Sequence, residues 1–148
     1  MEKQFSNFEN RLKDNSLKLT GPRQMILNVL ADHRTRHLTA DEIHRLLLEK
    51  DEKAGIATVY RTLSLLEKLE FVNGIYLDDG CIRYQLMDSS EKHEHHHLIC
   101  EKCGQIIDMP DDLLDQLEKQ VKEKYGFQVR NHKVKLYGIC CECDEKKD

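Results

Sequence analysis

Apolar side chains recur at intervals of three and four residues along four segments in the first half of the chain, which is the period of an amphipathic helix. The segments cover residues 5–14, 21–30, 40–47 and 56–69. Two of them carry start signals. Thr20 precedes Gly-Pro-Arg, and proline is tolerated in a first helical turn, whereas Thr39-Ala-Asp-Glu42 has the sequence of a capping box. The pattern therefore predicts four short helices.

The pattern changes to alternation after the fourth helix. Residues 72–77 and 81–86 alternate between apolar and polar side chains and are joined by Asp78-Asp79-Gly80, which is typical of a hairpin turn. Helices closed by a hairpin are the element order of a winged-helix domain, in which one helix enters the major groove of DNA. The first half is therefore predicted to be such a domain.

After a polar linker over residues 87–92, the second half of the chain shows a different order of predicted elements. Short apolar stretches predict strands on either side of Gly104, and Pro110-Asp-Asp opens a predicted helix whose apolar stripe runs to Tyr125. Residues 127–137 read as a further strand. We therefore expect an α+β protein, with an N-terminal winged-helix domain over residues 1–87 and a C-terminal α/β domain over residues 88–148.

Composition narrows the class of protein. The chain has 148 residues, 34% of them charged, which suits one average domain or two small ones. No apolar run approaches the roughly 18 residues that span a bilayer, and the N-terminus has no secretory apolar stretch. We therefore expect a cytoplasmic protein and no membrane partner.

The net charge of −4 is divided unevenly between the two halves. Residues 1–86 carry 13 basic and 13 acidic side chains, whereas residues 87–148 carry 10 and 14. The second half thus holds the whole excess of negative charge, and it also holds most of the cysteines and histidines.

Two Cys-x-x-Cys pairs give the strongest chemical signal. Cys100 and Cys103 form one pair, and Cys140 and Cys143 form the other. Four thiolates suit tetrahedral Zn(II), and a filled coordination shell leaves no position for catalysis, so the pairs predict a structural zinc site. Cys81 and Cys141 lie outside the pairs and are expected to be ordinary side chains.

The run from His93 to His97 contains His-Glu-x-x-His, the signature of zinc proteases. That signature functions on a helix, but the flanking sequence favours a strand here. On a strand, His95 and His97 face one side while Glu94 and His96 face the other. One strand can then supply ligands to two different metal sites, although a zinc hydrolase remains an alternative if the segment is helical.

Two further segments, Leu17-Lys-Leu-Thr-Gly-Pro-Arg23 and Ala57-Thr-Val-Tyr-Arg-Thr-Leu63, resemble the DNA-binding signatures of the ferric uptake regulator family. The resemblance covers nearly the whole chain and implies a homodimeric, metal-dependent repressor of transcription, not an enzyme, with the second half serving dimerisation. It implies that the recognition helix carries Thr58, Tyr60 and Arg61, and that Lys18 and Arg23 approach the DNA backbone or minor groove. These side chains are suited to DNA binding, because arginine can form hydrogen bonds with guanine and lysine can neutralise phosphate.

The resemblance also implies two regulatory metal sites. We call the first the hinge site, and its implied ligands are His37, His95, His97 and Asp108. Gln85 stands where the family usually has a carboxylate. The second site would draw on His96, Asp115 and His132, with Glu94 as a further candidate.

The choice of metal is left open by the ligand types. Mixed nitrogen and oxygen ligands suit Fe(II), Mn(II) or Zn(II). The resemblance favours an iron-sensing repressor that binds palindromic operators of iron-uptake genes. Asp108 is more typical of the peroxide-sensing branch, so peroxide sensing and zinc sensing are alternatives within the family. A zinc-storage protein is an alternative from a different class, but it would give the Tyr60-Arg61 helix no purpose.

Overall fold

The structure is a computed structural model that describes residues 2–87, 96–110 and 113–145, apart from the side chains of residues 2–5 and 7. The chain divides into two compact units, Met1–Ser89 and Ser90–Asp148. Each unit is described by itself below.

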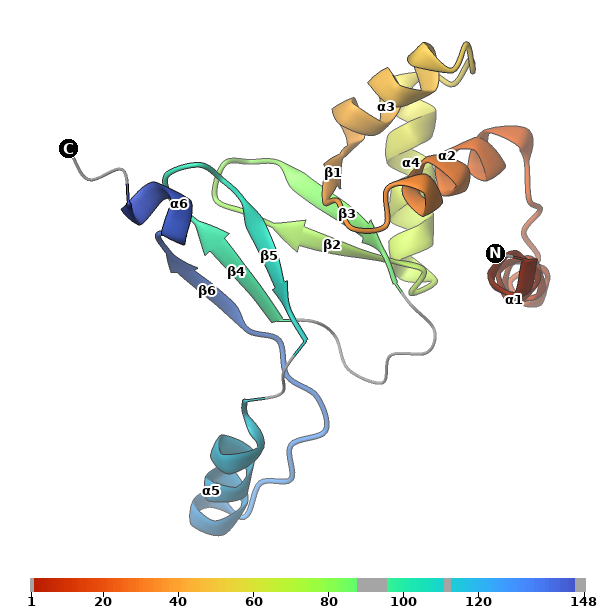
Figure 1. Cartoon of the computed structure of the whole chain (residues 1–148). Coiled ribbons are helices and arrows are strands. Elements are labelled where there is room, and N and C mark those ends of the chain that lie inside the picture. The colour runs from red at the N-terminus through yellow and green to blue at the C-terminus, as the bar shows by residue number, and fades with distance from the viewer. Residues whose placement is uncertain (1, 88–95, 111–112, 146–148) are drawn as a thin grey trace. The chain divides into compact units, whose positions relative to one another are not determined.

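The first unit contains the four helices that the apolar spacing predicts (Figure 1). They are α1 (Glu2–Asp14), α2 (Gly21–Asp32), α3 (Ala40–Glu49) and α4 (Ile56–Lys68).

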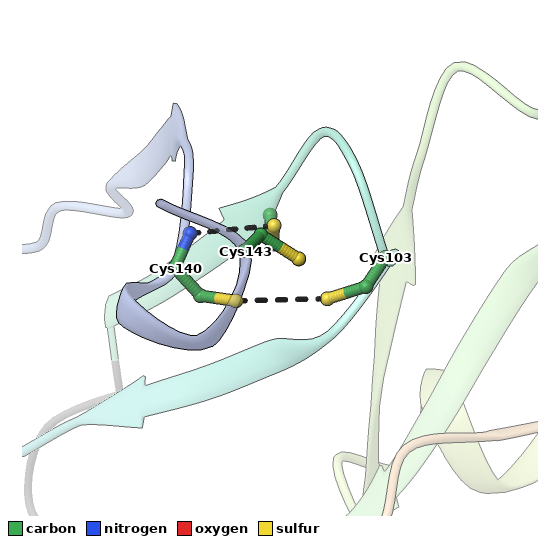
Figure 2. A group of neighbouring side chains, drawn as sticks. Cys103, Cys140 and Cys143 are labelled. Atoms are coloured by element: carbon green, nitrogen blue, oxygen red, sulfur yellow. Dashed lines mark hydrogen bonds between the residues drawn. The ribbon is translucent and has the colours of Figure 1, made fainter. Parts of the chain in front are cut away.

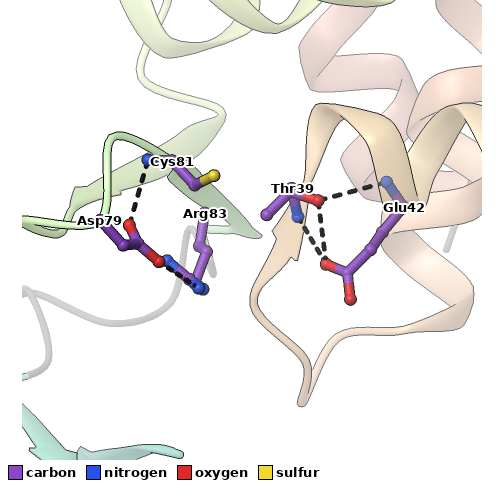
Figure 3. A network of polar contacts seen from close by, with 5 residues as sticks. All are labelled: Thr39, Glu42, Asp79, Cys81 and Arg83. Carbon is purple, nitrogen blue, oxygen red and sulfur yellow. Dashed lines mark hydrogen bonds and ion pairs between the residues drawn. The ribbon is translucent and has the colours of Figure 1, made fainter. Parts of the chain in front are cut away.

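The capping box of α3 is confirmed (Figure 3). The Glu42 amide donates to Thr39 Oγ1 at 3.2 Å, and the Thr39 amide donates to the Glu42 carboxylate at 2.8 Å. Thr20 occupies the N-cap of α2, but its side chain makes no capping hydrogen bond. The predicted start of α2 is therefore right, while its expected cap is absent.

A three-stranded antiparallel sheet closes the first unit. It consists of β1 (Leu38–Thr39), β2 (Val72–Tyr76) and β3 (Ile82–Leu86) in the order β1-β3-β2. Asp79 holds the hairpin turn, because its carboxylate accepts hydrogen bonds from the Cys81 amide at 3.0 Å and from Arg83 at 2.7 Å (Figure 3). Gly80 has a positive φ of 76°, which glycine adopts without steric cost.

The core of the first unit is fully apolar at its centre. The side chains with the least exposure come from α1, α2, α3, α4 and the sheet, so each predicted apolar stripe packs inward. The largest of them are Phe8, Leu12, Ile26, Leu30, Leu38, Ile43, Leu47, Leu63, Leu66 and Ile75. This packing fixes the exposed face of α4, which carries the predicted DNA contacts.

The second unit is a three-stranded sheet with two short helices. In chain order the elements are β4 (His96–Cys100), β5 (Ile106–Met109), α5 (Asp115–Tyr125), β6 (Lys135–Gly138) and α6 (Cys141–Asp144). The strand order is β5-β4-β6, with β5 antiparallel and β6 parallel to β4.

Three details of the second unit differ from the sequence predictions. The α5 helix begins at Asp115 instead of directly after Pro110, and residues 127–134 have no regular strand structure, so the predicted strand shrinks to β6. Gly126 ends α5 in the left-handed conformation with φ of 62°. The α6 turn, which the sequence pattern did not predict, presents the second Cys-x-x-Cys pair.

Little of the second unit is buried within the unit itself. Among its described residues, Ile99 and Cys100 are the buried apolar side chains, His96 and His97 are the buried polar ones, and α5 has no buried residue. The apolar stripe predicted on α5 is present but faces outward. No helix in the described parts of either unit is long and apolar enough to cross a membrane.

Candidate metal centres and nucleic-acid interface

The four paired cysteines come together in the second unit, and we call them the cysteine cluster. Cys100 is the last residue of β4. Cys103 lies in the turn to β5, Cys140 is the N-cap residue of α6, and Cys143 lies within α6 (Figure 2). The four Sγ atoms all lie within 4.8 Å of one another. The strand turn and the C-terminal helix are thereby joined at one point.

Local backbone geometry explains why the cysteine side chains converge. The Gly104 amide donates to the Cys100 carbonyl at 2.9 Å, and Gly104 has a positive φ of 73°, so the chain turns tightly beneath Cys103. The Cys140 amide donates to Cys100 Sγ at 3.3 Å, and the Cys143 amide donates to the Cys140 carbonyl at 3.0 Å. The backbone therefore forms the cluster with the thiols already directed inward.

The arrangement fits tetrahedral zinc. Sulfur atoms about 2.3 Å from a tetrahedral centre are about 3.8 Å from one another. Cys103 Sγ and Cys140 Sγ are 3.7 Å apart (Figure 2). Four thiolates would fill the coordination shell of zinc and leave no position for a reacting group, which is typical of a structural site.

The thiols of the cluster differ in acidity. Backbone amides of Cys103 and Cys140 directed at its sulfur lower the pKa of Cys100 to about 6. Contact with the Cys140 sulfur and burial raise the pKa of Cys143 to about 12. Four thiolates cannot collect at this spacing without a compensating cation, so zinc would replace protons here.

Of the predicted hinge-site ligands in the second unit, the structure describes His97 and Asp108. They are direct neighbours across the antiparallel β4–β5 pair, and His97 Nε2 lies 3.4 Å from Asp108 Oδ1. The His97 residue is only 4% exposed, whereas the Asp108 side chain is 26% exposed. An imidazole and a carboxylate on neighbouring strands supply the mixed ligands that divalent iron, manganese and zinc accept.

The remaining hinge-site candidates are described one by one. His37 is half-buried and directly precedes β1 in the first unit, and His95 lies outside the described residues. Gln85 lies on β3, and its carboxamide nitrogen donates to the Arg34 carbonyl at 3.2 Å. Gln85 therefore has a structural contact of its own in the first unit.

The second-site candidates show one agreement and one difference. The rings of His96 and His132 lie close together, with centroids 5.0 Å apart. However, the carboxylate that contacts His132 is Glu118, whose Oε1 lies 2.5 Å from His132 Nδ1. Asp115 is exposed at the start of α5, one turn before Glu118, and Glu94 lies outside the described residues.

His96 and His97 lie on strand β4, and this excludes the protease interpretation. The His-Glu-x-x-His signature needs both histidines on one helical turn, and its last residue, His97, belongs to a strand. Successive residues of β4 face opposite sides of the sheet, as the alternation predicts. His96 and His97 therefore face opposite sides of the sheet.

The first unit carries a basic hollow, which we call the arginine hollow. It has a volume of about 190 Å³ and is lined by Thr20, Pro22, Arg23, Thr58, Arg61 and Thr62. The lining brings together the two sequence segments that resemble DNA-binding signatures, although they lie more than 30 residues apart in the chain. Among these described residues are two guanidinium groups and no carboxylate, which suits a phosphate-rich partner.

The surface around the arginine hollow is open to solvent. Arg23 donates to the Lys18 carbonyl, so Lys18 and the hollow are adjacent, and Arg61 contacts Thr58 Oγ1 at 3.5 Å. Tyr60 is 49% exposed on α4, while Val59 and Leu63 of the same helix are buried. This helix therefore presents Tyr60 and Arg61 outward.

Glu118 is the functional candidate that the sequence did not reveal. It lies among many charged residues of α5, and its spacing from His132 carries no signal, because the contact depends on how the loop after Gly126 returns toward the helix. Its position three residues after Asp115 places it on the same helix face, which is the one available hint.

Comparisons with known proteins agree with these observations. Residues 14–137 match the family described as the Ferric uptake regulator family. The Ferric uptake regulation protein of Bacillus subtilis is 36% identical over 147 residues, which cover 99% of both chains.

Solved structures show the same likeness. The regulator of Helicobacter pylori, described as having three functional metal binding sites, aligns with a TM-score of 0.84 and 30% identity over 99% of this chain and 95% of that one. The regulator of Francisella tularensis, solved with iron, aligns with a TM-score of 0.76 and 31% identity over 86% of this chain and 95% of that one. The chain belongs to the ferric uptake regulator family of metal-responsive transcriptional repressors, which are regulators and not enzymes.

Proposed function

We propose that this chain is a homodimeric repressor that binds palindromic operators of iron-uptake genes when Fe(II) is bound. The observation that supports the proposal is that the candidate DNA-binding surface and the candidate metal ligands lie in different units. The arginine hollow and the exposed face of α4 belong to the first unit, whereas the cysteine cluster and the His97–Asp108 pair belong to the second. A regulator needs such separate sites for DNA and for the signal.

DNA binding is proposed for five residues of the first unit. Arg61 and Tyr60 project from α4 and can read base edges, since arginine bonds guanine in a bidentate manner and an apolar ring contacts the thymine methyl group. Thr58 and Arg23 line the arginine hollow, and Lys18 adjoins it. These three residues suit contacts to phosphates, which position the helix but do not select a sequence.

Dimerisation is proposed for the second unit. Large apolar side chains are exposed on and just before α5, on and just after the sheet strands, and in the loop that follows Gly126. They are Ile107, Leu113, Leu117, Tyr125, Phe127, Leu136, Tyr137 and Ile139. A single copy rarely exposes so many large apolar groups close together in sequence, and obligate dimers cover such surfaces with a second copy. Two copies related by a two-fold axis would present two recognition helices to a palindromic operator.

The hinge site is proposed to couple the metal signal to DNA binding. His37 of the first unit, together with His95, His97 and Asp108 of the second, would hold Fe(II). When it is bound, the cation restricts the arrangement of the two units relative to one another. A coupling of about 1 to 3 kcal/mol is enough for a useful switch, and DNA must then tighten metal binding by the same factor.

The ligands of the hinge site bear on which metal is sensed. Gln85 replaces a usual carboxylate, and its amide nitrogen is already bonded to Arg34. The site therefore offers less negative charge than one with two carboxylates, which should weaken its hold on hard cations. Asp108 favours a second candidate function, peroxide sensing, in which an iron-bound histidine is oxidised.

The second site is proposed to use His96, His132 and Asp115, with Glu94 as a further candidate. The adjacent rings of His96 and His132 support it. We place the protein in the cytoplasm, where a repressor meets DNA.

The test is a gel mobility-shift assay with operator DNA selected anaerobically in the presence of Fe(II), Mn(II) or Zn(II). Fe(II) is expected to tighten operator binding by roughly 5- to 150-fold, which corresponds to the coupling energy above. Selection with zinc alone would favour zinc sensing, and loss of binding with a 16 Da gain on His37 or His97 after peroxide treatment would favour peroxide sensing. A metallated dimer that selects no DNA would contradict the proposed function and favour zinc storage.

A further inference from the structure

The direction of the hydrogen bond between His132 and Glu118 follows from the chemistry of the two groups. His132 Nδ1 lies 2.5 Å from Glu118 Oε1, and the two side chains are 18% and 33% exposed. An ionised carboxylate can only accept hydrogen bonds. With Glu118 as an ionised carboxylate, Nδ1 of His132 carries the hydrogen and donates it to Glu118.

The second ring of the pair lies in a more enclosed environment. The His96 residue is 3% exposed, its ring centroid is 5.0 Å from that of His132, and the two ring planes are inclined by 33°. His96 Nδ1 is buried and has no hydrogen-bond partner in the described part of the chain. A buried imidazole nitrogen beside a second imidazole is costly unless a further group binds it.

We propose that Glu118 is a positioning residue of the second site, and this proposal rests on the second site proposed above. By holding the hydrogen of His132 on Nδ1, Glu118 leaves Nε2 as the nitrogen that can bind a cation. Histidines that bind metals commonly donate their other ring N–H to a carboxylate in this way, which fixes both the tautomer and the ring orientation. The carboxylate also makes the imidazole a stronger ligand.

Glu118 and Asp115 would then have different tasks. Asp115 is exposed at the first residue of α5, so its carboxylate is accessible for direct contact with a cation. Glu118 is one turn later on the same face and is already occupied by His132. The α5 helix would therefore supply one carboxylate to the site itself and one to the histidine that completes it.

The first measurement is made on the full-length protein with its structural zinc retained and the regulatory metals removed. Long-range proton–nitrogen NMR correlations of the imidazole rings report which nitrogen of each histidine carries the hydrogen. We expect Nδ1–H for His132 in the wild type and in Glu118→Gln, because glutamine keeps an acceptor oxygen. In Glu118→Ala we expect Nε2–H, the tautomer that predominates for a histidine in water.

The second measurement is Co(II) binding followed by visible absorption, in a His97→Ala background that disables the hinge site. Glu118→Ala should weaken second-site binding by about 10- to 100-fold, the usual effect of losing such a partner. Glu118→Gln should restore part of the loss. Glu123→Ala, which removes an exposed carboxylate from the same helix, serves as the matched control and should change neither measurement.

Two outcomes would overturn the role of Glu118: an unchanged His132 tautomer in Glu118→Ala, or unchanged Co(II) affinity in that variant. A third outcome separates this proposal from the one on which it rests. If His132→Ala leaves Co(II) stoichiometry unchanged in the His97→Ala background, the second site itself is wrong, and Glu118 loses its role whatever the tautomer shows.

Discussion

Replacing Cys103 with serine should unfold the second unit while the first unit keeps its structure. The reason is the unequal distribution of buried apolar surface. In the described residues of the second unit, Ile99 is the one buried aliphatic side chain, and burying it contributes about 1.5 to 3 kcal/mol. Structural zinc bound by thiolates contributes about 10 to 16 kcal/mol at pH 7. Within a single copy, the cysteine cluster therefore outweighs the buried apolar side chain of this unit by roughly three- to tenfold.

The first unit has no such dependence. Its buried side chains include Leu12, Ile26, Ile43 and Leu63, each fully enclosed by neighbouring helices. None of its described residues belongs to the cysteine cluster. Loss of zinc should therefore leave its free energy of unfolding nearly unchanged.

Hydrogen–deuterium exchange with mass spectrometry distinguishes the two units. In Cys103→Ser, we expect substoichiometric zinc and rapid exchange of the amides of β4 and β6, while amides of α2 and α4 remain protected. Cys141→Ser is the matched control, since Cys141 is an exposed neighbour of the cluster. Stoichiometric zinc and protected β4 amides in Cys103→Ser would refute the assignment of a four-cysteine zinc site.

Two other predictions concern the first unit. Burial raises the pKa of Tyr84 to about 12, against about 10 in an unfolded chain. The Tyr84 hydroxyl of the unfolded state therefore loses its proton first as the pH rises, and the free energy of unfolding falls between pH 10 and 12. At pH 11 the wild type should lose about 1.4 kcal/mol more than Tyr84→Phe, measured by urea denaturation relative to pH 9, and equal losses would contradict this pKa. Arg61→Ala should weaken operator binding by about 1 to 3 kcal/mol and relax its sequence preference. Lys18→Ala should instead weaken binding to all sequences and reduce the slope of log affinity against log salt concentration by about 1. Equal operator affinity of Arg61→Ala and the wild type would show that Arg61 does not contact the bases.

Local signals in the sequence predicted the elements that depend on neighbouring residues. The Thr39–Glu42 capping box and the Asp78–Gly80 turn are set by contacts within a few residues, and both are present in the structure. The strand β1 was missed because two residues carry no periodicity, and it exists through its pairing with β3 far along the chain. Non-local pairing of this kind has no local sequence signature.

The second unit was harder to predict for a related reason. The apolar stripe on α5 predicted burial, yet residues such as Leu117 and Tyr125 face outward, because a single copy of the chain provides no surface to cover them. The cysteine spacing was sufficient to predict the cluster, since metal ligands need fixed distances. Glu118 could not be foreseen, because its contact with His132 depends on the path of an irregular loop.

We propose above that metal bound to the second unit controls DNA binding by the first. The decisive measurement is operator affinity for the wild type and His97→Ala, with and without Fe(II), in anaerobic solution with the structural zinc in place. We expect Fe(II) to tighten wild-type binding by roughly 5- to 150-fold and to have no effect on the variant, while both proteins keep the same low affinity without Fe(II). Equal tightening of both proteins by Fe(II) would show that the His97 site does not control DNA binding.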